Sequence, residues 1–465
     1  ENFLFTVGNN PDQVVFLGGL PFIVLTLLLG LVTYYWAKKL YGQKAGIFAA
    51  FLVLFLPNIL AHGRLINTDL GLTLFLFLAI YFWIKFLKAP NWPNLLLAGL
   101  FIGLAFASKF TSLILIPIII ILMLVKLFFD RDFKKWWQYL LGFLGAIILG
   151  FIIVWATYGF SIEVPPEVTN SLSADISLWT NLNIPEGFDQ TFKVLRPIMF
   201  PAEFYKGLYL VGRHALAGHS SYLLGQTSST GWWYYFPVAI WYKTPMPFFI
   251  FLALAIIFWK KTKTKEPFNE IALILAPITF LVLSMYSKAD LGLRHVLPIF
   301  PFLAVLASKS INLIDFSSIK MINTNIKKLI PALLFLVLIL WYLLSSVSSY
   351  PNYLAYFNEL AGGPQNGYKI LGDSNLDWGQ DIFRIKKYLD EHQIDDGYIL
   401  YPWDGDKALH YYGINLEPFP WNNQDIKGYL VVSATYWQLA EMRWLDFSPR
   451  EQITPGVFIF DLSQD

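Results

Sequence analysis

Three polar regions could do chemistry because they gather acidic or basic residues next to long apolar runs or an expected helix. The first is His62-Gly63-Arg64-Leu65-Ile66-Asn67-Thr68-Asp69, which leads directly into an apolar run. One interpretation is that Thr68 or Asp69 only caps the next helix, a common arrangement at helix starts. The other is that Asp69 binds a cation or a reacting hydroxyl at the membrane surface. Asp69 and His62 are also the residues that we expect to hold a divalent metal, the one cofactor that the sequence leaves open.

The second region consists of three basic clusters. They are Gly292-Leu293-Arg294-His295-Val296-Leu297-Pro298, Trp241-Tyr242-Lys243-Thr244-Pro245 and Arg213-His214. Any one basic residue at a membrane rim could simply extend toward lipid headgroups. Together the three clusters predict a receptor for a phosphate, because guanidinium groups grip phosphate oxygens bidentately.

A third polar cluster lies near the C-terminus, directly before an amphipathic helix expected at Ile382 to Leu389. It reads Asp373-Ser374-Asn375-Leu376-Asp377-Trp378-Gly379-Gln380-Asp381. One interpretation is an N-cap and a turn, which favour these residue types. The alternative is a ligand or acceptor contact around Trp378. The residues that would form this contact are Asp373, Asn375, Asp377 and Gln380.

The elements that must position these residues are apolar runs of near-bilayer length. They lie roughly at 13 to 36, 45 to 61, 70 to 87, 93 to 108, 111 to 129, 138 to 157, 236 to 258, 269 to 286, 296 to 308 and 329 to 347. Such lengths predict about ten transmembrane helices. The run from 93 to 129 is expected to be a hairpin that turns near Ser108 and Lys109.

Basic residues are concentrated in every second gap between these runs. The clusters are Lys38, Lys39 and Lys44; Lys85 and Lys88; Lys126, Arg131, Lys134 and Lys135; Lys260, Lys261, Lys263 and Lys265; and Lys309, Lys320, Lys327 and Lys328. The positive-inside rule places these gaps in the cytoplasm. Residues 1 to 12, a long loop at about 158 to 235 and everything after about 350 are then extracytoplasmic. All three candidate segments fall on that side.

Composition supports a membrane protein. The chain is 56% hydrophobic and only 14% charged, too little charge for a soluble enzyme of 465 residues. The net charge of +2 reflects topology, so we expect no nucleic-acid partner. The absence of cysteine excludes thiolate metal sites, a cysteine nucleophile and disulfides. Few charges lie inside the apolar runs, which counts against an ion-coupled pump.

The pattern changes after about residue 350. Apolar runs shorten to strand length at Tyr398 to Tyr401, Tyr429 to Val432 and Val457 to Phe460. We therefore predict a transmembrane domain at 1–349 and a small extracytoplasmic α/β domain at 350–465. Overall the fold class is a polytopic α-helical membrane protein with this C-terminal domain.

Several stretches resemble a known family in their order along the chain. They are Phe55-Leu56-Pro57-Asn58-Ile59-Leu60-Ala61-His62-Gly63 through Thr68-Asp69-Leu70, Gly99-Leu100-Phe101-Ile102-Gly103-Leu104-Ala105 ending in Lys109, Lys243-Thr244-Pro245, Gly292-Leu293-Arg294-His295, and the Asp373 to Asp381 cluster. They are similar to bacterial members of glycosyltransferase family 39, relatives of protein O-mannosyltransferases and lipid A aminoarabinose transferases that share the GT-C fold. The resemblance covers nearly the whole chain.

This resemblance implies a transferase that moves a sugar, such as the hexose mannose, from a polyprenyl-phosphate donor to an extracytoplasmic acceptor. In such enzymes a carboxylate is the general base, and basic groups or a metal stabilise the departing lipid phosphate. By similarity Asp69 matches the second acidic position of the family's site. Arg294, His295 and Lys243 would bind the phosphate, with Lys109, Arg213 and His214 as further substrate contacts. The expected location is the plasma membrane.

The family's general base lies in a first outer loop, after the first helix, and this sequence starts beyond that position. Residues 1 to 12 offer only Asp12. We therefore expect that the chain lacks the N-terminal catalytic loop and shows no transfer by itself. The alternative function is a transporter or flippase of a lipid-linked sugar, and a purely structural anchor is a third reading. The sequence leaves the sugar, the oligomeric state and the acceptor (protein, lipid or glycan) open.

Overall fold

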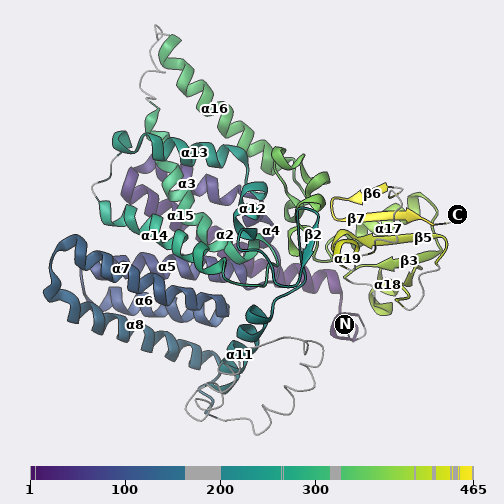
Figure 1. Cartoon of the computed structure of the whole chain (residues 1–465), viewed down its shortest axis with the longest axis horizontal. Coiled ribbons are helices and arrows are strands. Elements are labelled where there is room, and N and C mark those ends of the chain that lie inside the picture. The colour runs from purple at the N-terminus through teal and green to yellow at the C-terminus, as the bar shows by residue number, and fades with distance from the viewer. Residues whose placement is uncertain are drawn as a thin grey trace.

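The computed structural model shows a helical body with a small sheet-containing region beside it (Figure 1). It describes residues 2–5, 7–162, 201–262, 264, 266–314, 326–402, 405–421, 426–439, 442, 449 and 451–462. Part of the predicted outer loop, at 163–200, lies outside the described residues, as do Lys263, Lys265 and Lys320 and the side chains of Lys327 and Lys328.

All ten predicted apolar runs are helical. The helices of the body are α1 (Asn2–Phe5), α2 (Pro11–Tyr41), α3 (Gln43–Leu54), α4 (Pro57–His62), α5 (Asp69–Lys88), α6 (Trp92–Ser108), α7 (Leu115–Asp130), α8 (Trp136–Thr157), α11 (Ala202–Ala217), α12 (Tyr235–Lys243), α13 (Met246–Ile257), α14 (Pro267–Ser284), α15 (Phe300–Ser308) and α16 (Ile326–Val347). Short 3₁₀ helices η1 (Phe110–Ile114), η6 (Leu293–Ile299) and η7 (Lys309–Leu313) continue α7 and α15.

Within the described residues, seven helical spans are long and apolar enough to cross a membrane, or eight when α12 and α13 count as one bent span. The two remaining runs form the shorter apolar helices α3 and α6. The predicted fold class, a polytopic helical membrane protein with a small C-terminal α/β region, is confirmed. The number of full-length spans is lower than the ten predicted because runs 45–61 and 93–108 form helices of only 12 and 17 residues.

Breaks in the helices follow proline and the predicted turn. Run 45–61 divides before Pro57, and run 236–258 bends by 105° between Lys243 and Met246, where Pro245 follows Thr244. Proline disfavours helical backbone in the residue before it, so both breaks have a local cause. The predicted hairpin is confirmed: α6 ends at Ser108, and Lys109 has extended backbone before η1.

Helix α5 lies at the centre of the body, with 72% of its most apolar window buried. It packs against α2, α6 and η6. Small residues bring α6 and α8 close together: a Cβ on Gly103 would lie 2.8 Å from the carbonyl oxygen of Gly150. The central position of α5 places its first residue, Asp69, inside the protein.

The gaps predicted to be cytoplasmic contact one another at one end of the body, called here the basic end. Lys88 Nζ lies 2.7 Å from Glu266 Oε2, and Lys309 Nζ lies 3.1 Å from Glu270 Oε1. The Tyr41 hydroxyl donates to the same Glu270 oxygen at 2.8 Å. The alternation of gaps along the sequence therefore corresponds to two separate ends in space.

The C-terminal region contains a five-stranded sheet in the order β4-β3-β5-β7-β6 (Figure 1). Its strands are β3 (Gly397–Leu400), β4 (Glu417–Pro418), β5 (Tyr429–Ser433), β6 (Glu451–Thr454) and β7 (Val457–Asp461), and the helices beside it are α17 (Ile382–Glu391), α18 (Asp406–Tyr412) and α19 (Ala434–Leu439). The pairs β3–β4 and β3–β5 are parallel, whereas β5–β7 and β6–β7 are antiparallel. The predicted strands and the predicted helix are confirmed.

The two faces of this sheet belong to different hydrophobic clusters. Leu430 and Phe460 belong to the cluster that extends through the helical body, whereas Val431 and Ile459 pack in a separate cluster with α17. Successive strand residues point to opposite faces, which explains this division. Body and sheet therefore share a core, and the division at 349/350 stays a prediction.

Candidate active site

Asp69 begins α5 and its side chain is almost completely buried, with 1% exposed. Its backbone N–H donates to Asn67 Oδ1 at 2.9 Å, and Thr73 Oγ1 donates to its carbonyl oxygen at 2.7 Å. Thr68 occupies the N-cap position but its side chain makes no capping hydrogen bond. The expected cap by Thr68 or Asp69 is thus corrected: Asn67 supplies the capping oxygen, and the Asp69 carboxylate is used elsewhere.

Two basic side chains from other loops between the helices contact the Asp69 carboxylate. Lys109 Nζ donates to Oδ1, and Arg294 Nη1 lies 3.6 Å from Oδ2. The side chains of Lys109 and Arg294 are 17% and 20% exposed, so both reach the surface from a buried partner. The trio carries one net positive charge. We call Asp69, Lys109 and Arg294 the ion-paired trio.

Two histidines lie near the trio. His62 is buried at the end of α4, where Asn67 Nδ2 lies 3.4 Å from its Nδ1. It lies within electrostatic range of all three members of the trio. His295 lies within range of Lys109, Arg294 and His214. His62 and His295 therefore lie near the trio, whereas His214 is related to it only through His295.

The C-terminal polar cluster docks directly on this site. The Trp378 ring lies 4.5 Å from the Arg294 guanidinium carbon, and Arg294 Nε donates to Ser374 Oγ at 3.1 Å. Gly292 has φ +141°, and a Cβ there would lie 2.5 Å from Ser374 Oγ. Only glycine permits this backbone and this close approach. Arg294 is thus held by an aromatic face, a hydroxyl and a carboxylate.

Lys243 takes a different role from the one predicted for it. Its Nζ donates to the carbonyl oxygens of Leu354 at 2.8 Å and Asn375 at 2.6 Å, and lies 4.5 Å from the Phe357 ring centre. The side chain is 1% exposed. Because the bend after α12 turns Lys243 inward, it fastens the C-terminal segment to the body, separately from the trio.

Of the four predicted contacts of the C-terminal cluster, Asp377 and Gln380 stabilise its own turns, whereas Asn375 joins the cluster to the helical body. Asn375 Oδ1 accepts from Leu293 N–H at 3.0 Å, Asp377 Oδ1 accepts from Gly379 N–H at 2.7 Å, and Gln380 Oε1 accepts from Trp378 N–H at 2.6 Å. Burial raises the pKa of Asp377 to about 6, against hydrogen bonds that favour its charged form. The turn interpretation therefore describes Asp377 and Gln380, while Asn375 also donates to the Tyr235 hydroxyl at 2.9 Å.

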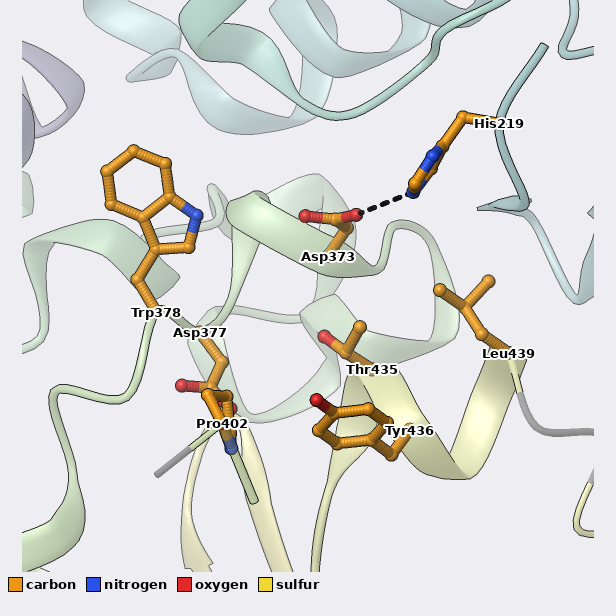
Figure 2. A pocket seen from close by; sticks show the side chains of 8 residues that line it. All are labelled: His219, Asp373, Asp377, Trp378, Pro402, Thr435, Tyr436 and Leu439. Atoms are coloured by element: carbon orange, nitrogen blue, oxygen red, sulfur yellow. Dashed lines mark ion pairs between the residues drawn. The ribbon is translucent and has the colours of Figure 1, made fainter. Parts of the chain in front are cut away.

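Asp373 and Asp377 both line a cavity, in which the Asp373 carboxylate faces His219 (Figure 2). One oxygen accepts from the Ser374 N–H, and the other lies 3.9 Å from His219 Nε2. Burial raises the pKa of Asp373. The cavity has a volume of about 390 Å³ and is lined by His219, Asp373, Asp377, Trp378, Pro402, Thr435, Tyr436 and Leu439. We call it the Asp373 pocket.

Sequence reasoning missed His219, Thr435 and Tyr436. His219 follows α11, close to the short hairpin of β1 (Ser221–Leu223) and β2 (Gln226–Ser228), and its N–H donates to the carbonyl oxygen of Lys288 at 3.2 Å. The His214 and His219 rings lie 5.2 Å apart. Arg213, in contrast, stacks on Tyr209 of its own helix at 5.6 Å. Of the predicted pair, the structure brings only His214 toward the pocket.

A divalent metal does not fit the residues predicted to hold it. Each oxygen of Asp69 already faces a cation, one from Lys109 and one from Arg294. A metal ion there would need to displace one of these charges. Among the described residues, no group of three His, Cys, Asp or Glu side chains is placed to hold a metal.

Comparison with known proteins adds a family and several structures. The family described as "Dolichyl-phosphate-mannose-protein mannosyltransferase" matches residues 3–155, about a third of the chain. No curated protein matches. Similar solved structures include ArnT from Cupriavidus metallidurans in the apo state, with 12% identity, TM-score 0.45, and coverage of 95% of this chain and 82% of that one.

Two further structures are similar at the same level. ArnT from Cupriavidus metallidurans bound to undecaprenyl phosphate has 14% identity, TM-score 0.44, and coverage of 98% and 85%. The oligosaccharyltransferase AglB from Archaeoglobus fulgidus, in complex with an inhibitory peptide and a dolichol-phosphate, has 14% identity, TM-score 0.43, and coverage of 94% of this chain and 60% of that one. The family match confirms, over residues 3–155, the resemblance that the sequence motifs predicted.

Proposed function

We propose that this protein is a membrane glycosyltransferase that takes a sugar, a hexose such as mannose, from a polyprenyl-phosphate donor. The observation that carries the proposal is the ion-paired trio, in which Asp69 holds two partly exposed cations. Of the trio, Arg294 belongs to the basic clusters that the sequence predicted to bind phosphate, and Lys109 is one of the further substrate contacts that the resemblance implied. The family match over residues 3–155 supports the same donor class.

The chemistry of the trio suits a leaving phosphate. When the bond between the sugar and the phosphate breaks, negative charge grows on the lipid phosphate, and fixed cations stabilise that charge most. Arg294 is positioned by Trp378, Ser374 and Asp69 before any ligand arrives. Asp69 acts here as the anion that holds Arg294 and Lys109 in place. Such preorganisation avoids reorganisation during the reaction.

Sidedness follows from the same geometry. The trio lies at the end of the body opposite the basic end, and basic residues gather on the cytoplasmic side of membrane proteins. We therefore propose that the trio and the C-terminal region face the extracytoplasmic side of the plasma membrane. The lipid tail of the donor would remain in the bilayer while its phosphate meets Arg294 and Lys109.

A flippase for the lipid-linked sugar is the second candidate, and one observation favours it. The 105° break between α12 and α13 is the kind of interrupted span that transporters use. Lys243 is the last residue before that break, and its ammonium donates to two carbonyl oxygens. Such an arrangement gives the break a structural role, so we favour the transferase.

One assay separates the two functions. The full-length protein is reconstituted in vesicles with a polyprenyl-phosphate hexose that carries labels on both lipid and sugar. A transferase releases free lipid phosphate and passes the sugar label to an acceptor, whereas a flippase moves the doubly labelled molecule intact. Movement of the intact donor with no release of lipid phosphate would overturn the proposed function.

A further inference from the structure

We infer that the Asp373 pocket is the acceptor site and that it takes a hydroxyl-rich ring, the chemistry of a carbohydrate acceptor. This inference rests on the proposed function, because it supplies the second substrate of that reaction. It concerns residues from three distant parts of the chain: His219 after α11, Asp373 and Trp378 in the polar cluster, and Thr435 and Tyr436 at the start of α19.

The pocket adjoins the ion-paired trio through shared residues. Trp378 lines the pocket and also stacks on Arg294 at 4.5 Å. Ser374, next to Asp373, accepts the hydrogen bond from Arg294 Nε. Asp373 itself lies within electrostatic range of Arg294. An acceptor in the pocket would therefore lie beside a phosphate bound at the trio, as a transfer between the two requires.

The lining groups match a ring that carries hydroxyls. Figure 2 shows Asp373 between Trp378 and His219, with Thr435 and Tyr436 also lining the pocket. The aromatic rings of Trp378 and Tyr436 offer apolar surface to a sugar ring. The Asp373 carboxylate, the His219 imidazole and the Tyr436 hydroxyl offer hydrogen-bonding groups for ligand hydroxyls.

Thr435 provides a further sign of a missing polar partner. Its Oγ1 is buried and has no hydrogen-bond partner among the described residues. Such a buried hydroxyl is costly to leave unpaired, and a ligand hydroxyl would satisfy it. The volume of about 390 Å³ lies in the range of small-molecule pockets and suits one or two sugar rings. These features favour a carbohydrate over an extended peptide.

The test measures acceptor binding and donor binding separately. The full chain is placed in lipid nanodiscs, and saturation-transfer NMR measures binding of methyl α-mannoside, methyl α-glucoside and N-acetyl-threonine amide. We expect the glycosides to bind and the threonine derivative to bind more weakly. Asp373→Asn and Tyr436→Phe should each weaken glycoside binding, and Tyr436→Ala should weaken it about tenfold or more.

Two control variants test whether weaker glycoside binding is specific to changes in the pocket. Asp390→Asn removes a carboxylate that, among the described residues, pairs with Lys386 on the outside of α17, and Tyr286→Ala removes a ring that is 81% exposed. Both should leave glycoside binding unchanged. Thermal unfolding of each variant shows whether it is folded, and the conservative changes Asp373→Asn and Tyr436→Phe serve if Tyr436→Ala does not fold.

Three results would each overturn the inference. They are absence of glycoside binding by the unaltered chain, stronger binding of the threonine derivative, and unchanged glycoside binding in all pocket variants. Binding of a polyprenyl phosphate is measured on the same samples and should survive the pocket variants. If the unaltered chain does not bind the polyprenyl phosphate, the proposed function is refuted instead. Failure of the acceptor-site inference and failure of the proposed function are therefore distinguishable.

Discussion

The two ends of the helical body each contain a buried carboxylate paired with a lysine, yet the two clusters are built differently. At the basic end, Lys309 and Glu270 are 0% and 6% exposed, and the Trp259 ring centre lies 3.1 Å from the lysine Nζ. At the other end, Asp69 is equally buried, but its partners Lys109 and Arg294 remain partly exposed. One cluster is sealed, and the other is open to a ligand.

The net charge of the two clusters also differs. Glu270 receives one lysine and one tyrosine hydroxyl, which balances a single negative charge with a single positive charge. Asp69 receives two full positive charges, which leaves one in excess. A balanced, sealed pair stabilises a fold, whereas an open pair with a spare positive charge favours an anion. The two clusters thus differ in exposure and in net charge, and this difference supports the proposed binding role of the trio.

The strongest test of the sealed cluster is Lys309→Met. The change leaves Glu270 as a buried carboxylate without its cation, which costs about 3–5 kcal/mol when one partner of a buried pair is removed. Fluorescence-monitored unfolding in detergent should show this loss, while binding of a polyprenyl phosphate by the folded fraction stays unchanged. Lys260→Met, at an exposed position of the same end, is the control. Weaker lipid-phosphate binding in Lys309→Met would break the comparison.

The corresponding test of the open cluster is Arg294→Ala. Hydrogen bonds to charged groups are worth about 1.5–3 kcal/mol, so binding of decaprenyl phosphate should weaken roughly 10- to 100-fold. Asp69 keeps Lys109 in this variant, so the free energy of unfolding should fall less than in Lys309→Met. Equilibrium binding in nanodiscs checks the first expectation. Unchanged affinity would show that the spare positive charge serves the fold alone.

The side of the membrane on which the trio lies was predictable from the sequence. Membrane topology places every second loop between the helices on the same side. Asp69, Lys109 and Arg294 are far apart along the chain, yet all follow or precede apolar runs on the same side. Helices that cross a layer return every second loop to one end, so counting basic residues placed these three on one side. Their direct contact came only from the structure, because the sequence grouped Arg294 with Lys243 and Arg213 instead. The strands after residue 350 were also predictable, because their alternation is local.

Other parts depended on long-range docking that no local pattern records. Lys243 looked like a rim lysine, but the bend before Pro245 turns it into the protein toward Leu354 and Asn375. His219 and Thr435 belong to the Asp373 pocket only because the segment after α11 and the start of α19 reach the same turn. Neither has a neighbouring motif in the sequence. These contacts are set by packing among distant segments.

The open end should also respond to pH through Asp290. This carboxylate is 1% exposed, accepts the Trp232 N–H at 2.6 Å, and has a pKa raised to about 7 by burial. A raised pKa means that the folded protein keeps a proton that the unfolded chain has lost. Stability should therefore fall as pH rises from about 4 to 7, by at most about 1.4 kcal/mol per pH unit, and level off above pH 7.

Asp290→Asn provides the check, because asparagine keeps an oxygen for the Trp232 N–H but does not titrate. Unfolding midpoints at pH 5, 6, 7 and 8 should depend less on pH in this variant than in the unaltered protein. Asp390→Asn, on the exposed side of α17, should follow the unaltered protein. Parallel curves for all three proteins would contradict the assignment of this pH dependence to Asp290.

The smallest expected effect concerns Ser374, which holds Arg294 without touching a ligand in the proposal. Ser374→Ala removes the acceptor of the 3.1 Å hydrogen bond from Arg294 Nε, while Asp69 and Trp378 still hold the guanidinium. Because these two partners keep Arg294 close to its position, we expect lipid-phosphate binding to lose only about 1 kcal/mol, a weakening of roughly fivefold. Combining Ser374→Ala with Arg294→Ala tests whether the effect acts through Arg294. In the double variant the serine change should add nothing, whereas a full fivefold further loss would mean that Ser374 acts independently of Arg294.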